Sequence, residues 1–254
     1  PWWAGPIMMG LACVAQPAHF AYGEGPQHVI TPQGVDFGIW GDLPQEPVPT
    51  LFVFAGSMET TLDGANNGYY RQCAKFLQPK GYLCVSLDLP CHGKDHRAEE
   101  SEGLRGWRER AEAGHPVMES FVNRVRDVID YLVQQRATDP QRIAACGISR
   151  GGFAALHLAA REPRVAAVAA FAPVTDLAAL HEFAGAEELP AVQALSLSRA
   201  AAQLAGRPIW LIIGDQDHRV GTDHAIRFAR SVSRASQEAK IPGGLELHVI
   251  PESA

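Results

Sequence analysis

A serine flanked by glycines carries the clearest chemical signal in this sequence. The motif Gly147-Ile148-Ser149-Arg150-Gly151 follows a short apolar run at residues 142–148 and precedes an apolar stretch at 152–160. A sharp strand-to-helix turn strains the serine backbone, so the flanking positions need residues without bulk. The following helix would direct the positive end of its dipole at Ser149. We therefore predict that Ser149 is the nucleophile of an acyl transfer and that the Arg150 N–H donates to the oxyanion. The plain alternative is a glycine-rich turn before a helix.

Alternating strand-like and helix-like segments must position this serine. Several apolar runs are continuous rather than alternating, which is typical of parallel strands covered on both faces. Strand, helix and strand in repetition predict a parallel sheet with right-handed crossovers. We expect strands at residues 50–55, 82–89, 142–148, 165–171, 208–213 and 245–250, helices near 66–79, 118–136, 151–162 and 222–236, and an antiparallel strand ahead of them at 34–40.

Two longer segments interrupt the alternation. Residues 91–117 are polar, charged and contain glycine, and a second stretch at about 176–207 precedes the strand at 208. Long insertions in a compact fold usually cover a binding site. Neither segment is long enough to form a separate lid domain, so we expect both to shape a pocket.

The turn after the strand at 50–55 introduces a family resemblance. Its sequence, Ala55-Gly56-Ser57-Met58, resembles the α/β-hydrolase pattern in which His-Gly follows the third strand, with Ala55 in place of the histidine. The resemblance covers nearly the whole chain from about residue 35. It is nearest to the dienelactone hydrolase, acetyl xylan esterase and prolyl-oligopeptidase-like branches, which the Ser-Arg-Gly-Gly at 149–152 also fits.

This resemblance implies an α/β-hydrolase fold, with a mostly parallel central sheet, helices on both faces and no separate lid domain. At 254 residues and 46% hydrophobic content the chain can bury such a core. We expect residues 1–254 to form a single domain, with residues 1–34 as an N-terminal extension packed on it. The resemblance also implies that the Ser57 N–H is the second oxyanion donor, with Met58 as its rival and an ordinary glycine turn as the alternative.

A second turn resembles the part of the family that carries the catalytic acid. Gly214-Asp215-Gln216-Asp217-His218-Arg219-Val220 is similar to the Gly-x-x-Asp-x-x-Val pattern. The pattern implies that Asp217, rather than Asp215, holds the catalytic imidazole in its tautomer. Asp215 is then a turn or capping carboxylate.

The family usually carries Gly-His a few residues past its last strand, which here is 245–250. The sequence reaches Ala254 without this pair. We therefore expect a truncated C-terminus, a catalytic histidine beyond Ala254 and little activity without it. His248 is the alternative base, although a strand should direct it toward a sheet face. His92 and His115, near the two insertions, are candidates for substrate contact.

Other chemistries find little support in the sequence. His92-Gly93-Lys94-Asp95-His96 has the histidine spacing of a metal-binding helix, but Gly93 weakens a helix there and no Glu follows His92. Residues 88–93 instead resemble the family's Asp-x-Pro-x-His-Gly loop. No phosphate loop or dinucleotide fingerprint occurs. We expect neither a metal nor a cofactor.

Composition limits the partners. The net charge is −6 and basic residues form no long run, which argues against nucleic acid. The apolar residues 6–15 are too short to span a membrane and lack a basic leader, so the compartment stays open, with the cytoplasm favoured. Five irregularly spaced cysteines argue against a disulfide framework but leave room for one bridge. The oligomeric state is not determined.

Together these features predict a serine hydrolase that acts on a small-molecule acyl substrate. Hydrolysis of carboxylic esters through an acyl-enzyme on Ser149 is the first choice. A peptidase or a thioesterase of the same fold is an alternative. A non-catalytic scaffold that binds a ligand or partner is the other alternative, if no histidine follows Ala254.

Overall fold

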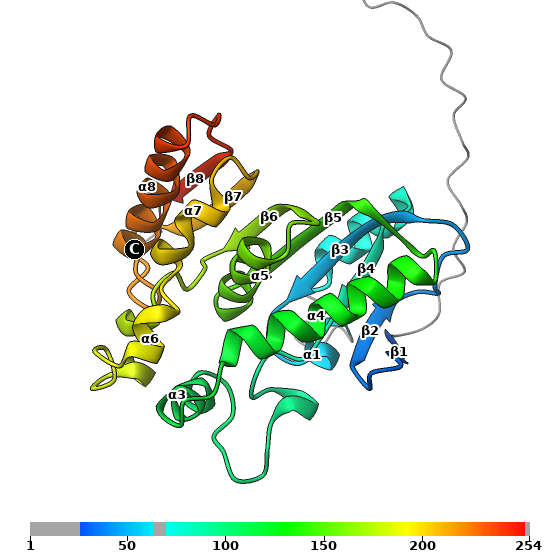
Figure 1. Cartoon of the computed structure of the whole chain (residues 1–254), viewed down its shortest axis with the longest axis horizontal. Coiled ribbons are helices and arrows are strands. Elements are labelled where there is room, and N and C mark those ends of the chain that lie inside the picture. The colour runs from blue at the N-terminus through cyan, green and yellow to red at the C-terminus, as the bar shows by residue number, and fades with distance from the viewer. Residues whose placement is uncertain (1–25, 63–69, 252–254) are drawn as a thin grey trace, which may run out of the picture.

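The protein is built on one eight-stranded sheet (Figure 1). The computed structural model describes residues 26–62 and 70–251, so the apolar segment 6–15 of the predicted extension lies outside the described residues. The strand order is β1-β2-β4-β3-β5-β6-β7-β8. The strands are β1 (Pro26–Ile30), β2 (Asp36–Trp40), β3 (Val48–Phe54), β4 (Leu83–Ser86), β5 (Thr138–Ile148), β6 (Val165–Phe171), β7 (Ile209–Gly214) and β8 (Leu245–Ile250).

Strands β3 to β8 run parallel, whereas β1 and β2 are antiparallel at one edge. The predicted parallel sheet and the antiparallel strand near 34–40 are confirmed. The last five residues of β3 are all buried, because helices cover both faces of this strand. This burial explains the unbroken apolar sequence. Strand β1 was not predicted, since Gln27 and His28 break any apolar pattern in this five-residue element.

Long and short helices join the strands. The helices predicted near 118–136, 151–162 and 222–236 are confirmed within a few residues, whereas the short ones inside the predicted loops were missed. The prediction near 66–79 is met by a helix at its end, and residues 63–69 lie outside the described part. The helices are α1 (Met58–Leu62), α2 (Gln72–Leu77), α3 (Leu104–Glu112), α4 (Val117–Gln134), α5 (Arg150–Arg161), α6 (Pro190–Ala194), α7 (Ala201–Leu204) and α8 (Thr222–Glu238).

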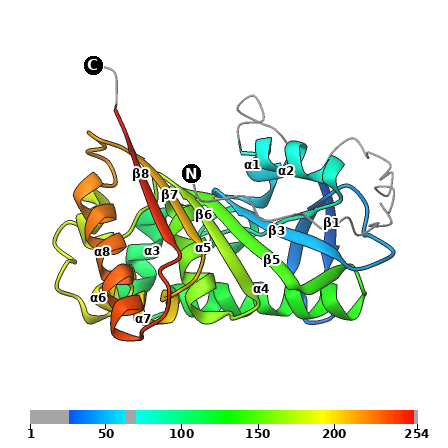
Figure 2. The ribbon, with the colours of Figure 1, turned by 90° about the horizontal axis from the view of Figure 1, so that it is seen from above.

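The helices form two unequal layers (Figure 2). Helices α4, α5 and α8 cover one face, where the larger core lies. Helix α4 buries Phe121, Val125, Val128 and Leu132, which recur every three or four residues and therefore form one stripe. Phe121 meets Phe54 of β3 edge-on, with ring centroids 5.2 Å apart. This layer fixes the start of α5 against the sheet.

The opposite face is covered by α1 and α2 on one half of the sheet. Over β6 to β8, none of the helices described here covers that face (Figure 2). The rings of Phe171, Trp210 and His248 form a row there, with centroids 5.5 Å and 5.3 Å apart. Phe171 is 40% exposed. This half of the sheet therefore presents an aromatic, partly exposed surface.

Both predicted insertions contain short helices and contact each other. Helix α3 lies within 91–117, and α6 and α7 lie within 176–207. Arg108 of α3 donates to the Ala184 carbonyl at 2.8 Å and so joins the two segments. The predicted absence of a separate lid domain is confirmed. No helix in the described part of the chain is long and apolar enough to cross a membrane.

Candidate active site

Ser149 occupies a strained turn between β5 and α5. Its φ and ψ are 52° and −119°, a region that non-glycine residues rarely adopt. The main chain fixes the turn, because the Ser149 N–H donates to Phe171 O at 2.9 Å and the Ser149 carbonyl accepts from Phe153 and Val174 at 3.1 Å each. Its hydroxyl has no hydrogen-bond partner among residues 26–62 and 70–251. Ser149 itself is half-buried.

The glycines around Ser149 allow main chains to touch. A Cβ atom on Gly147 would lie 2.3 Å from Gly151 O, and a Cβ on Gly151 would lie 2.0 Å from Phe54 O. Both distances are far below van der Waals contact, so neither position accommodates a side chain. The first turn of α5 consequently rests directly on the carboxyl end of β3. The Arg150 N–H belongs to this first turn, where a helix supplies no acceptor.

The loop after β3 lies beside the Ser149 turn. Arg150 Nε donates to Ala55 O at 3.3 Å, which links the two segments. The Ser57 hydroxyl accepts from the Thr60 N–H at 3.1 Å and so caps α1. The Met58 N–H donates to Asp88 Oδ1 at 2.6 Å. Of the two rival oxyanion donors, Met58 is therefore already engaged.

Asp88 is a positioning residue that the sequence analysis did not single out. Its Oδ1 accepts from Met58, and its Oδ2 accepts from the Lys94 N–H at 2.8 Å. Gly93 permits this arrangement, because a Cβ there would lie 2.4 Å from Asp88 Oδ1. Asp88 thereby joins the loop after β3 to the loop after β4. The available signal was the Asp-x-Pro-x-His-Gly resemblance, which had suggested a loop without a role for the aspartate.

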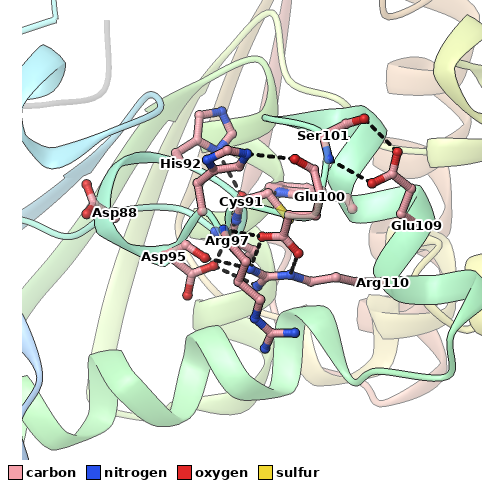
Figure 3. A network of polar contacts seen from close by, with 12 residues as sticks. Asp88, Cys91, His92, Asp95, Arg97, Glu100, Ser101, Glu109 and Arg110 are labelled. Carbon is pink, nitrogen blue, oxygen red and sulfur yellow. Dashed lines mark hydrogen bonds and ion pairs between the residues drawn. The ribbon is translucent and has the colours of Figure 1, made fainter.

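A buried ionic network stiffens the loop after β4 (Figure 3). Arg110 of α3 contacts Asp95 at 2.6 Å and Glu100 at 2.5 Å. The hydrogen bond from Arg110 lowers the pKa of Glu100 to about 2, which keeps the carboxylate charged. Trp107 Nε1 donates to Pro90 O at 2.5 Å. These contacts hold the backbone of the loop in place, so the loop side chains near Ser149 keep fixed positions.

His92 projects from this loop toward Arg150. Its Nδ1 lies 2.8 Å from Pro90 O, so Nδ1 carries the proton in the neutral ring. Burial lowers the pKa of His92, and the neighbouring Arg150 adds to this effect. A Cβ on Gly103 would lie 3.5 Å from His92 Nε2 and 3.3 Å from Arg150 Nη1. The neutral imidazole of His92 and the guanidinium of Arg150 therefore both lie next to Gly103, close to Ser149.

The guanidinium of Arg150 has no counter-charge at contact distance. Within the described residues no carboxylate forms an ion pair with it. Glu182 pairs instead with Arg219, and Glu100 pairs with Arg110. Burial lowers the pKa of Arg150, and the neighbouring Tyr70, Glu102 and Glu182 oppose that effect. A guanidinium that has a carbonyl acceptor, but no carboxylate partner among the described residues, therefore lies next to the candidate nucleophile.

Asp217 is held in the turn between β7 and α8. Its Oδ1 accepts from the N–H groups of Arg219 and Val220, each at 2.9 Å. Its Oδ2 has no partner in the described part of the chain, and the residue borders a hollow of about 350 Å³. Asp215 is exposed, and its N–H donates to Ile250 O at 2.8 Å. The two N–H groups that Asp217 Oδ1 accepts fix the orientation of this carboxylate within its turn.

Strand order brings these pieces to one edge of the sheet. β5 lies between β3 and β6, and β7 follows β6. Ser57 therefore follows the strand next to Ser149 on one side, while Asp217 follows the second strand on the other. With strands about 4.8 Å apart, Ser149 and Asp217 leave the sheet roughly 10 Å from each other. One substrate-sized site can involve all three positions.

The described histidines do not complete this arrangement, because none hydrogen-bonds to Asp217. His248 of β8 pairs in register with Ile212 of β7, on the aromatic face of the sheet and two residues before the end of the strand. Its Nε2 lies 3.3 Å from Glu246 Oε2. His157 is buried, its Nε2 donates to Leu195 O at 2.9 Å, and burial lowers its pKa to about 3. It links α5 to the second insertion.

His115 was expected near the substrate and lies elsewhere. It borders a hollow of about 520 Å³ together with Arg161, the last residue of α5. Ser149 immediately precedes the first residue of this helix. A twelve-residue helix is about 18 Å long, so His115 sits near the far end from the nucleophile. The sequence position of His115 inside the first insertion was therefore a poor guide.

Comparison with known proteins identifies the family. The sequence profile of the dienelactone hydrolase family matches residues 58–242, and the chain belongs to this family of the α/β-hydrolase superfamily. No match was found among curated protein sequences.

Solved structures share the fold at low sequence identity. A cold-adapted esterase from an Arctic intertidal metagenomic library is 17% identical, with a TM-score of 0.61, over 89% of this chain and 83% of that one. An esterase of Pyrococcus furiosus is 18% identical, with a TM-score of 0.58, over 92% and 84%. Dipeptidyl peptidase 4 of Porphyromonas gingivalis is 18% identical, with a TM-score of 0.63, over 90% of this chain but only 32% of the peptidase.

The contact at Gly151 yields a prediction. Gly151→Ala forces α5 away from β3 and displaces the Ser149 turn, so labelling of Ser149 by a fluorophosphonate should slow on the order of a hundredfold. Gly243→Ala is the matched control, because a Cβ there meets nothing within 4 Å. Circular dichroism checks that both variants fold. Equal labelling rates in the two folded variants would disprove the importance of the contact.

Proposed function

We propose that this protein hydrolyses carboxylic esters through an acyl-enzyme on Ser149. The observation that carries the proposal is the strained turn that holds Ser149 at the start of α5, between the loop after β3 and the Asp217 turn. A nucleophile there has helix N–H groups in front of it and a carboxylate within reach of a bridging imidazole. Membership of a hydrolase family supports the same chemistry.

In the proposed reaction, Ser149 Oγ attacks the ester carbonyl carbon and an imidazole takes its proton. The N–H groups of Ser57 and Arg150 donate to the oxyanion that forms. Collapse of this intermediate expels the alcohol, which receives the proton, and water then releases the acid by the same steps. Asp217 orients the imidazole and stabilises its charged form.

The imidazole in this proposal comes from the segment that follows β8. The last residue of β8 accepts a hydrogen bond from Asp215, two residues from Asp217. The end of β8 therefore lies near the turn that borders the hollow beside Asp217. His248 is the less suitable base, because it lies on the aromatic face of the sheet, behind this edge.

The guanidinium of Arg150 suggests which esters are preferred. It is half-buried, lies against Ala55 and Gly103, and lacks an ion-pair partner among the described residues. An anionic group on the substrate would supply the missing counter-charge, and a charge-assisted hydrogen bond is the stronger kind. We therefore favour esters that carry a carboxylate on the acyl chain over neutral esters.

Covalent labelling tests the reaction. Full-length protein should react with a fluorophosphonate at Ser149 and should hydrolyse p-nitrophenyl esters, and Ser149→Ala should abolish both, because the nucleophile is gone. Peptide mass spectrometry locates the label. If full-length, folded protein is not labelled at Ser149, the proposal fails and a non-catalytic scaffold becomes the better interpretation.

The acid is tested by comparing two neighbouring substitutions. Asp217→Asn should lower kcat by a factor on the order of ten thousand with little change in fold, because the imidazole loses its orientation and its counter-charge. Asp215→Asn, the matched control, should retain most of the activity. Steady-state kinetics with one p-nitrophenyl ester measures both. The reverse ranking would transfer the role to Asp215.

The substrate preference is tested with a pair of esters. The ratio of kcat/KM for mono-p-nitrophenyl adipate to that for p-nitrophenyl hexanoate should exceed one and should fall roughly tenfold to a hundredfold in Arg150→Met, which removes the charge but keeps an unbranched chain. Arg142→Met is the control, because Arg142 is an exposed residue of β5, seven positions before Ser149. An unchanged ratio in Arg150→Met would rule out the anion contact, whatever the absolute rates.

A further inference from the structure

Two cysteines far apart in the sequence meet beneath the Ser149 turn. Cys73 lies on α2 and Cys146 near the end of β5, and their Sγ atoms are 3.9 Å apart across a sequence separation of 73 residues. This is close to van der Waals contact between the sulfurs. A disulfide requires the two sulfurs to approach to about 2.05 Å, so a shift of roughly 2 Å separates this contact from a covalent bond.

The two thiols share a cavity. It has a volume of about 230 Å³ and is lined mostly by apolar groups, among them Cys73, Cys146, Gly147 and Phe171. Cys146 immediately precedes Gly147, the first glycine of the motif around Ser149. The space is large enough for a small oxidant to reach the sulfurs from the open side of the sheet.

The environments of the two thiols differ in the way that sequential oxidation requires. Cys73 is half-buried, and the hydrogen bond from Cys146 lowers its pKa. Cys146 is buried, and its pKa is raised by that same hydrogen bond and by burial. Cys73 is therefore suited to attack as the thiolate, and Cys146 to resolve the product.

The other described cysteines lack this combination. Burial raises the pKa of Cys84 and of Cys91 to about 12. Cys84 packs in the same apolar cluster as Cys146, and Cys91 lies in the larger core on the opposite face. Both are inert small hydrophobes by this reasoning. Cys84 in particular serves as an internal control for position without reactivity.

We propose that Cys73 and Cys146 form a peroxide-reactive dithiol that closes to an intramolecular disulfide next to the Ser149 turn. The Cys73 thiolate attacks one oxygen of a hydroperoxide, the O–O bond breaks, and the departing oxygen takes a proton to become water or an alcohol. Cys73 is then a sulfenic acid. The Cys146 sulfur attacks it, the S–O bond breaks, and water leaves with the Cys146 proton. Two thiols are oxidised and one hydroperoxide is reduced.

The disulfide would join α2 to β5 three residues before Ser149. It would also remove two thiols from the wall of the cavity. The inference stands on the geometry of the two sulfurs and does not depend on the proposed esterase activity. It holds equally if the protein is a scaffold.

Peptide mapping after oxidation tests the proposal. Full-length protein is treated with hydrogen peroxide, quenched with an alkylating agent and digested without reduction. We expect one new cross-linked peptide pair containing Cys73 and Cys146, loss of two titratable thiols from the five in the chain, and recovery of both on reduction. The cross-link should be absent from Cys73→Ser and unchanged in Cys84→Ser, with circular dichroism confirming that each reduced variant folds.

Three results would overturn the proposal. Cys73 and Cys146 could both be recovered as alkylated thiols at peroxide doses that oxidise the methionines. They could be oxidised separately to sulfinic acids without a cross-link. The cross-link of Cys73 could join it to another cysteine, such as Cys13, which Cys13→Ser would reveal. Each of these outcomes shows that the sulfurs do not reach each other.

Discussion

The contact between the first turn of α5 and the end of β3 sets the geometry of everything around Ser149. No Cβ atom fits at Gly151, where it would lie 2.0 Å from Phe54 O. The main chains therefore approach more closely than side chains allow, and Ser149, the N–H groups of the helix and the loop with Ser57 lie close together. The strain at Ser149 persists because main-chain hydrogen bonds on both sides over-determine the turn.

Two carboxylates then fix the loops on either side of this contact. Asp88 accepts two main-chain N–H groups and joins the loops after β3 and β4, while Asp217 accepts two within its own turn. In both cases one carboxylate holds irregular backbone through hydrogen bonds from main-chain N–H groups. Arg150 is the exception, a cation near the serine with no carboxylate partner among the described residues.

The sheet could be read from the sequence because buried parallel strands leave long apolar runs, and the Ser149 turn because glycines mark a main-chain contact. Short elements left weaker traces. Helix α3 is polar and contains Gly106, so it resembled a loop, and β1 has only two strongly apolar residues. Asp88 escaped notice because its partners are main-chain groups of residues 58 and 94, which no side-chain pattern reports. The same limit applies to Cys73 and Cys146, whose proximity depends on where α2 settles on the sheet.

Many of the hydrogen bonds that hold the candidate site together have main-chain carbonyl oxygens as acceptors. Pro90 O alone receives His92 and Trp107, and Asp88 O receives Arg124. A carbonyl is present whatever residue occupies the position, so these acceptors survive substitution as long as the backbone keeps its path. In a mutational scan, substitution of the donor side chain should therefore be tolerated less well than substitution of the residue that supplies the carbonyl. The surface that meets the substrate can then diversify in sequence while its scaffold stays in place.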